Sequence, residues 1–343
     1  MSLDLSFFER PTNISAKVIC DSISEAGVRL TTFEIEYPRI VMSEFNTMRA
    51  ISKNSSSSRA IPVSKMLEHT KNINLKPIYF GSKKSGMQAG DELLGVELEQ
   101  AKGVWEASLR NAVESSEMLD SLGVAKEVTN RLVEPFQLVK VVCTATDWDN
   151  FFNLRLHPDS DPNICMLAYK MYEAMQESKP ITLKAGEWHL PYVNLGWNGK
   201  GEMCYADEDF NFVDLGQAIK LSAASCASVS YRTEGMTLAK ADKIFDMLIN
   251  AEVIHASPFE HLATPVQKSR YYREGDSVIF DVDECRSVNL KEFISTWEKG
   301  ITHLRRDGRF GSGNLTGWIQ YRHLLPNNTS YAFDFNARMG MFK

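Results

Sequence analysis

Residues 43–59 read SEFNTMRAISKNSSSSR, a helix-like segment followed by a serine cluster that Arg59 closes. Serine hydroxyls and loop N–H groups can surround a phosphate oxyanion, and a guanidinium can close on it with two charge-assisted hydrogen bonds. Serine runs are also common in linkers, so a flexible surface loop is the alternative interpretation. Other segments of the chain decide between the two.

Size and composition are those of an ordinary globular protein. The chain has 343 residues, of which 43% are hydrophobic and 24% charged, and no low-complexity linker divides it. We therefore expect one elaborated catalytic domain over residues 1–343 rather than two independent domains. The formal net charge of −6 gives no electrostatic reason to expect a nucleic-acid partner.

The cysteines and the first residues point to a reducing compartment. The six cysteines contain no CxxC pair, which argues against a zinc knuckle or a disulfide framework. The opening MSLDLSFFERPTN lacks a basic region followed by an apolar stretch, and no apolar run is long enough to cross a bilayer. We expect a cytoplasmic protein that is neither secreted nor inserted in a membrane.

Hydrophobic periodicity predicts both strands and helices. Alternating patterns at 17–23 and 28–35 indicate two strands joined around Gly27, and Pro38 suits the first turn of a following helix. That helix would have one face made of Val41, Phe45, Met48 and Ser52. Later segments predict helices at 95–122, 164–175 and 239–251, a buried strand at 134–143, a small-residue strand or turn at 222–231, and an ordered loop or insertion at 180–201.

Three further segments set polar groups among apolar residues. Residues 144–158, TATDWDNFFNLRLHP, suit a flat heterocycle because Asn150 and Arg155 would project beside an aromatic wall, although a core helix with a salt-bridged arginine is the alternative. Residues 311–322, GSGNLTGWIQYR, contain no Rossmann fingerprint. Three polar residues lie at or just after its end, and they are interpreted either as ligand contacts or as residues on the edge of a strand or helix: Gln320, Arg322 and His323.

Residues 255–261 read HASPFEH, in which two histidines flank Glu260. Zinc-binding HExxH places its histidines four apart on one helical face, whereas these are six apart with Pro258 between them. No metal site is therefore expected. Ser257 and Glu260 are ligand partners, or Ser257 is an N-cap with Pro258 at the first helical position. No serine-hydrolase elbow, Walker loop, kinase set or Pro-Cys-His nucleophile motif is present.

Together these segments resemble the flavin-dependent thymidylate synthases, the ThyX family. The signature RHRxxSxNExSxR is similar to TMRAISKNSSSSR at 47–59, and the asparagine-helix motif NARSLxNFLxLR is similar to TATDWDNFFNLR at 144–155. The motifs CARVSY and GHxxPFEH look like CASVSY at 226–231 and HASPFEH at 255–261. Their order differs from that of the short family members and resembles a circular permutation, as in the longer, often phage-encoded branch.

The resemblance implies an α+β fold in which helices pack against an antiparallel sheet, with 180–219 as a possible insertion. It also implies a homotetramer, in the host cytoplasm if a phage encodes it, that methylates dUMP with FAD, NADPH and methylenetetrahydrofolate. Arg155 would polarise the uracil ring as the catalytic group. The dUMP contacts would be Glu44, Ser57, Ser58, Arg59, Arg131, Arg155, Gln320 and Arg322. The FAD contacts would be Arg49, Asn54, Thr144, Thr146, Asn150, His255, Ser257, Glu260 and His323.

The chain departs from the signature at Thr47, Met48 and Ser55, where the family has Arg, His and Glu. QYRH at 320–323 resembles the QWxRH that normally leads into the signature, so we expect the C-terminal segment to lie beside 47–59 and to replace the lost contacts. Two alternatives remain open. One is an enzyme of altered product or substrate, such as a hydroxymethylase or a UMP or dCMP methylase. The other is a non-catalytic nucleotide-binding protein.

Overall fold

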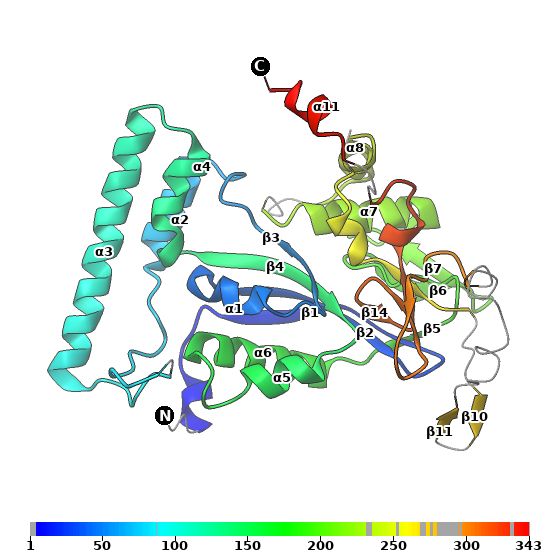
Figure 1. Cartoon of the computed structure of the whole chain (residues 1–343), viewed down its shortest axis with the longest axis horizontal. Coiled ribbons are helices and arrows are strands. Elements are labelled where there is room, and N and C mark those ends of the chain that lie inside the picture. Colours follow the sequence, from blue (N-terminus) through cyan, green and yellow to red (C-terminus); the bar gives the residue numbers. More distant parts are fainter. Residues whose placement is uncertain are drawn as a thin grey trace.

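The computed structural model describes residues 5–86, 88–230, 235–251, 254–267, 272–274, 277–279, 294, 297–329 and 333–342. At its centre is a five-stranded sheet in the order β3-β4-β2-β1-β5 (Figure 1). Its strands are β1 (Ser15–Ser24), β2 (Arg29–Pro38), β3 (Ser52–Ser55), β4 (Leu138–Ala145) and β5 (Ile181–Leu183). All neighbours are antiparallel except β5, which pairs with β1 in parallel. The strands expected at 17–23 and 28–35 are confirmed.

The two faces of this sheet differ in polarity because successive side chains of a strand point to opposite faces. One face carries Phe33 and Ile35 of β2 and Val141 of β4, all buried in the largest core cluster. The intervening positions place polar residues on the opposite face, where Thr32 and Thr144 are register partners. The sheet therefore has one apolar face for packing and one partly polar face.

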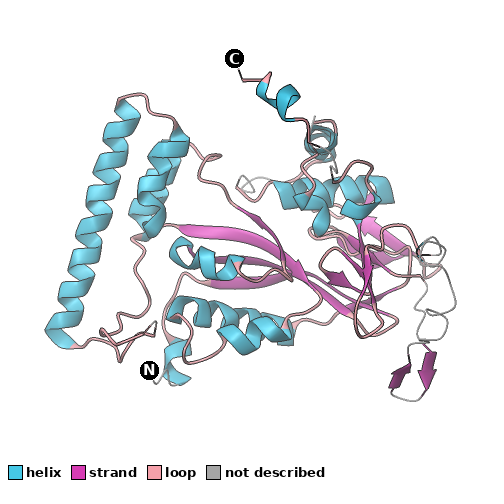
Figure 2. Cartoon of the chain, viewed as in Figure 1, coloured by secondary structure: helices cyan, strands magenta, loops and turns pink. Residues whose placement is uncertain are grey.

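Helices α5 (Asp149–Arg155) and α6 (Pro162–Glu177) form a layer with α1 (Met42–Asn46) beside the sheet (Figure 2). Ile164, Leu167 and Met171 of α6 are fully buried in the same core as the apolar sheet face. The side chain of Asp161 caps α6 by accepting a hydrogen bond from the backbone N–H of Asn163. The helix expected at 164–175 is confirmed.

A helical arm extends from one end of the sheet (Figure 1). Its elements are α2 (Val63–Ile73), α3 (Gly95–Ser121), α4 (Lys126–Thr129) and the 3₁₀ helix η3 (Asn130–Phe136). They bury a separate cluster that includes Leu67, Leu109, Val113 and Phe136. The helix expected at 95–122 is confirmed as α3. Leu109 and Val113, which recur at helical spacing, lie on its buried face. None of the described helices is long and apolar enough to cross a membrane.

The remainder of the chain forms small sheets around two helices that pack against each other, α7 and α8. Their bounds are α7 (Leu215–Ala227) and α8 (Leu238–Ile249). Three sheets accompany them: β6 (Asn194–Trp197) with β7 (Met203–Ala206) and β8 (Phe212–Val213); β12 (His303–Leu304) with β13 (Phe310–Ser312) and β14 (Leu315–Thr316); and β9 (Ala263–Pro265) with β15 (Trp318–Gln320). The other elements are η1 (Leu5–Glu9), η2 (Arg39–Val41), η4 (Ser257–Glu260), η5 (Tyr321–Leu324), β10 (Tyr272–Glu274), β11 (Ser277–Ile279) and α11 (Phe335–Met339).

The helix expected from Pro38 onward is wrong in both its start and its length. Pro38 is still paired with Leu138 as the last residue of β2, and the α-helix that follows a short 3₁₀ turn ends at Asn46. Ser52 belongs to β3, where pairing with β4 overrides the helical spacing. Met48 nevertheless packs half-buried against the core, as expected.

Three smaller expectations are also corrected. Of the strand or turn expected at 222–231, residues 222–227 belong to α7, whose small residues are buried against neighbouring elements, 228–230 form a turn, and Tyr231 lies outside the described residues. The strand expected at 134–143 begins four residues later, at Leu138, because η3 occupies the preceding residues. Ser257 is not an N-cap: it is the first residue of η4, no side-chain capping bond is made, and Pro258 lies in the first turn.

Helix α7 begins with a capping box that sets its start. The Asp214 carboxylate accepts from the Gln217 backbone N–H at 2.8 Å, and the Gln217 side chain accepts from the Asp214 N–H at 3.0 Å. We expect Asp214→Ala to lower the free energy of unfolding by about 1 kcal/mol, because a helix N–H loses its acceptor. Urea denaturation measures this value. Asp209→Ala is the control, and equal midpoints for the two variants would contradict the capping role.

Candidate functional site

The signature segment contacts the CASVSY segment, although the contacting residues are 172 and 173 positions apart in the chain. Asn54 of β3 donates from Nδ2 to the Cys226 carbonyl oxygen at 3.1 Å. The Ser57 backbone N–H donates to Ser230 Oγ at 2.9 Å. Tyr231, the last residue of the motif, lies outside the described residues. The fold thus joins two of the motif segments directly.

The other motif segments meet on the same side of the sheet. Thr144 Oγ1 lies 2.8 Å from His261 Nδ1. This contact links the start of the asparagine-helix motif to the HASPFEH segment. Gln320 donates from Nε2 to the Glu260 carbonyl oxygen at 3.4 Å, and Arg322 forms an ion pair with the Glu260 carboxylate. The Arg322 guanidinium also has a buried Nε without a hydrogen-bond partner.

The C-terminal segment lies beside the signature segment, as the QYRH resemblance leads us to expect. Asn314 accepts from Ser52 Oγ at 2.9 Å and donates to the Ala50 carbonyl oxygen at 2.8 Å. Gln320 Nε2 donates to Asn314 Oδ1 at 2.7 Å. Gly313, at φ +59°, allows this close approach, because a Cβ there would lie 2.3 Å from Gln320 Oε1 and 2.9 Å from His323 Nε2. Gln320 and His323 therefore flank one turn.

A cavity of about 770 Å³ opens next to this contact. Three of the expected FAD residues line it, namely Arg49, Thr146 and Asn150, together with residues of the C-terminal segment such as Asn314. The Thr316 backbone N–H donates to Thr146 Oγ1 at 3.1 Å, which holds the two sides of the cavity together. The cavity therefore lies between the start of α5 and the C-terminal segment.

The residues of this cavity fit an anionic, hydrogen-bonding ligand such as FAD, which carries a pyrophosphate. Arg49 is exposed and makes no hydrogen bond or ion pair within the part of the chain that the structure describes. The cavity wall also includes Trp148, whose buried indole N–H has no partner. The Arg305 guanidinium lies 2.7 Å from the Asp147 carboxylate and offsets its negative charge. Arg49, Thr146 and Asn150 are the residues that would hold the cofactor.

A buried polar chain runs across the polar face of the sheet. Ser22 Oγ lies 2.8 Å from His189 Nδ1, and His189 Nε2 lies 2.8 Å from Thr32 Oγ1. Thr32 Oγ1 lies 2.7 Å from Thr144 Oγ1, which contacts His261. Within this chain of contacts, each hydroxyl can donate in one direction and accept in the other.

Both histidines of this chain are neutral at ordinary pH. Burial lowers the pKa of His189 to about 3, with a further contribution from His261. Burial alone lowers the pKa of His261 to about 3. His261 Nε2 is buried and has no hydrogen-bond partner. Sequence reasoning missed His189 because it lies in 180–201, a segment with no recognised motif, and its place depends on the register of β1 and β2.

The expected phosphate-binding residues gather around η3. Ser58 Oγ donates to Glu134 Oε1 at 2.8 Å, and the Arg59 guanidinium lies 3.2 Å from Glu127. Arg59 has 67% of its side chain exposed, and Arg131 on η3 is exposed as well. The Ser57 side chain accepts from the Arg59 backbone N–H at 3.3 Å. Ser57, Arg59 and Arg131 are therefore exposed, whereas Ser58 is buried.

Arg155 lies against α1, beside another expected dUMP residue. Its Nη2 donates to the Glu44 carbonyl oxygen at 3.4 Å and to Thr47 Oγ1 at 3.1 Å, and its buried Nε has no partner. His255 is exposed, and its backbone N–H donates to the Leu248 carbonyl oxygen at 3.1 Å. Within the described residues no hydrogen bond or ion pair joins Arg59, Arg155 and His255. A single protomer thus presents separate groups of expected site residues.

No metal-binding group of three or more His, Cys, Asp or Glu side chains occurs among the residues that the structure describes. The thiolate is the reactive form of cysteine. Burial raises the thiol pKa and leaves little thiolate at neutral pH, so buried thiols are poor nucleophiles. Burial raises the pKa of Cys20 to about 12 and raises that of Cys143 further. Neither thiol is therefore placed to form a covalent bond with a substrate at neutral pH.

No protein-family model matches the chain, and no curated protein matches it. Similar solved structures include two of the UMP/dUMP methylase PolB from Streptomyces cacaoi. The one bound with 5-Br dUMP is 14% identical, with a TM-score of 0.38 over 48% of this chain and 91% of that chain. The one bound with 5-Br UMP is 15% identical, with a TM-score of 0.39 over 49% of this chain and 90% of that chain. Both TM-scores are too low to establish a shared fold.

Proposed function

We propose that the protein is a flavin-dependent thymidylate synthase that transfers a one-carbon unit from methylenetetrahydrofolate to dUMP, with NADPH as reductant. The observation that carries the proposal is the convergence of distant motif segments around β3. Asn54 contacts Cys226, and Gln320 contacts both Ser52 and Glu260. Motif matches that were chance similarities would have no reason to meet in the folded chain.

In this proposal FAD, when bound, supplies the hydride transfer. The protein positions the reactants and stabilises charge. Arg49, Thr146 and Asn150 hold the cofactor in the cavity that they line. Arg155 places positive charge beside the uracil ring, where negative charge develops on an oxygen. The exposed Arg59 and Arg131 suit a site that another subunit completes, as in the homotetramer that the family resemblance implies.

Product analysis tests the proposal. The purified protein is incubated with FAD, NADPH, methylenetetrahydrofolate and dUMP, and the nucleotides are separated by chromatography. The expected product is dTMP, formed only when all four components are present. A colourless protein that neither binds FAD nor turns over dUMP would instead support a non-catalytic nucleotide-binding role.

A second candidate is a related enzyme that makes a different product or methylates another pyrimidine nucleotide. It is favoured by Thr47, which replaces the first signature arginine and accepts a hydrogen bond from Arg155 at 3.1 Å. Because Arg155 polarises the pyrimidine ring in this proposal, a change in its hydrogen-bond partner can change which pyrimidine base the enzyme prefers. Parallel reactions with dUMP, UMP and dCMP distinguish the candidates, and a hydroxymethylated product would select the altered-product enzyme.

Cofactor binding gives a more specific prediction. We expect Arg49→Gln to weaken FAD binding by about 10-fold or more, because a hydrogen bond to a charged group contributes about 1.5–3 kcal/mol. Quenching of flavin fluorescence on titration with protein measures the affinity. Arg110→Gln, an exposed arginine of α3, is the matched control. If both variants bind FAD as the unchanged protein does, Arg49 is not a cofactor ligand.

A further inference from the structure

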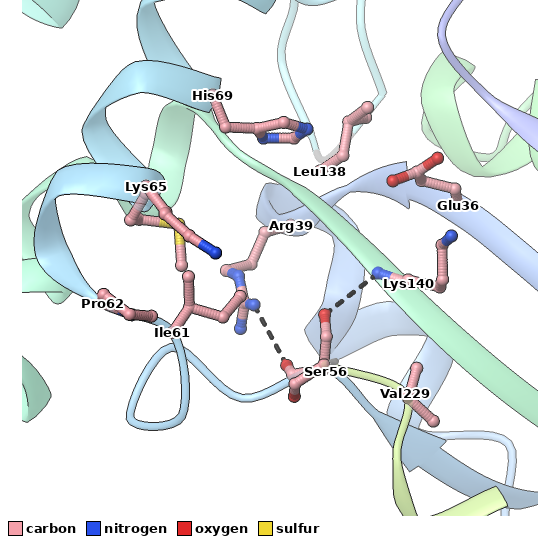
Figure 3. Close-up of a pocket in the computed structure, with 12 residues that line it drawn as sticks. Glu36, Arg39, Ser56, Ile61, Pro62, Lys65, His69, Leu138, Lys140 and Val229 are labelled. Carbon is pink, nitrogen blue, oxygen red and sulfur yellow. Dashed lines mark hydrogen bonds between the residues drawn. The ribbon is translucent and has the colours of Figure 1, made fainter. Parts of the chain in front are cut away.

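A second cavity of about 370 Å³ lies away from the proposed cofactor cavity, between strands β2 and β4, helix α2 and Val229–Ser230 (Figure 3). Three cationic side chains line it, namely Arg39, Lys65 and Lys140, against one carboxylate, that of Glu36. None of these residues belongs to a motif that sequence analysis identified. The cavity therefore carries a surplus of positive charge that the proposed roles do not explain.

Arg39 is the most deeply placed of the three cations. Only 11% of its side chain is exposed, its Nη2 donates to the Ser56 carbonyl oxygen at 3.2 Å, and its Nη1 lies 3.8 Å from the Glu134 carboxylate. Its buried Nε has no hydrogen-bond partner. Burial lowers the pKa of the guanidinium, although arginine remains charged at neutral pH. A buried charge of this kind is stabilised when an anion lies beside it.

Of the other two cations, Lys65 is the one available to a ligand beside Arg39. Lys65 makes no hydrogen bond or ion pair with any described residue, and Figure 3 shows its ammonium pointing toward the Arg39 side chain. The Lys140 ammonium lies 3.8 Å from the Glu34 carboxylate, and Figure 3 shows it beside Glu36, away from Arg39 and Lys65. The hydroxyls of Ser56 and Ser230 line the same cavity. The Ser56 hydroxyl accepts from the Lys140 backbone N–H at 3.2 Å and still has a proton to donate.

Most of the remaining cavity wall is apolar. It consists of Ile61, Pro62, Met66, Leu138 and Val229, together with His69. A pocket with a cationic group at one side and an apolar wall at the other suits a ligand with one anionic end and one less polar body. Its size is in the range of small-molecule sites, which start at about 300 Å³. A bare inorganic ion would leave the apolar wall uncovered.

We propose that this cavity binds the phosphate group of a small phosphorylated ligand, held by Arg39 and Lys65. The body of the ligand then packs on the apolar wall, and Glu36 can accept a hydrogen bond from one of its hydroxyl groups. If the proposed function is right, on which this identification rests, the ligand is the uridylate substrate. Its phosphate then sits beside Ser56 rather than against the exposed Ser57 and Arg59.

The test measures binding by isothermal titration calorimetry, with dUMP, deoxyuridine and inorganic phosphate as separate probes. We expect dUMP to bind and deoxyuridine to bind at least about 10-fold more weakly, because it lacks the charge-assisted contacts. Lys65→Gln should weaken dUMP binding by about 10-fold. Lys65 is exposed on α2, so this substitution leaves the core intact. Lys71→Gln on the same helix is the control, because Lys71 pairs with Glu117 of α3.

The outcomes separate this proposal from the proposed function. If dUMP binds and methylation occurs, but Lys65→Gln binds dUMP unchanged, the cavity is not the phosphate site and the proposed function stands. If dUMP does not bind, but inorganic phosphate binds and Lys65→Gln weakens it, the phosphate site stands and uridylate is excluded as its ligand. If neither dUMP nor phosphate binds, the phosphate site is overturned.

Discussion

Replacing Arg155 with glutamine is expected to lower kcat for dUMP methylation by about 10²–10³-fold, the usual cost of removing one preorganised charge stabiliser. Arg155 is suited to this role because its Nε is buried without a partner, while its Nη2 is held by Glu44 and Thr47. Those two contacts fix the guanidinium in place without neutralising it, since a carbonyl and a hydroxyl carry no charge. The charge therefore remains available to the uracil ring.

The measurement is the steady-state rate of dTMP formation at saturating dUMP and methylenetetrahydrofolate, which gives kcat. Arg155→Lys keeps the positive charge and should recover part of the lost rate, which a purely structural role would not predict. Arg110→Gln on α3 controls for loss of a surface arginine. Melting temperatures of the variants separate a folding defect from a catalytic one. A value of kcat for Arg155→Gln within about twofold of the unchanged protein would remove Arg155 from the mechanism.

The parts of the fold that sequence reasoning predicted correctly are those with strong local patterns. Helix α3 and the hairpin of β1 and β2 follow their 3.6- and two-residue periods. The segment after Pro38 was predicted as one long helix, but β3 forms there by pairing with β4, which comes more than 80 residues later. Pairing with such a distant partner leaves no local trace, so periodicity could not find it.

The candidate site divides in the same way. Asn54, Gln320 and Glu260 could be singled out because motif resemblance marks individual residues. The structure joins Gln320 to Glu260 and Asn54 to Cys226. Their roles in binding, and the circular permutation, remain predictions. Arg39 and Lys65 could not be found in this way, because each lies on a different element and only the folded chain places them in one cavity. A lone lysine on a helix carries no signal of its own.

Lowering the pH from 6.5 toward 3 is expected to destabilise the protein steeply because of two buried histidines. His189 and His261 have folded-state pKa values of about 3, lowered chiefly by burial. In the unfolded chain their pKa returns to about 6.5, so below that pH the unfolded state binds protons that the folded state does not. Stability therefore rises with pH across this window and falls as the pH drops.

Each of these histidines should contribute a slope of roughly 1.4 kcal/mol per pH unit between the two pKa values. Urea denaturation at several pH values between 7 and 4 measures the slope. His189→Gln removes one of the two titrating groups, so it should lower the slope by about that amount even if the variant is less stable at pH 7. His157→Gln is the control, because its imidazole is exposed and lies outside the buried polar chain. Equal slopes for His189→Gln and the unchanged protein would show that His189 becomes protonated in the folded state, and so that the polar chain from Ser22 to His261 is open to water.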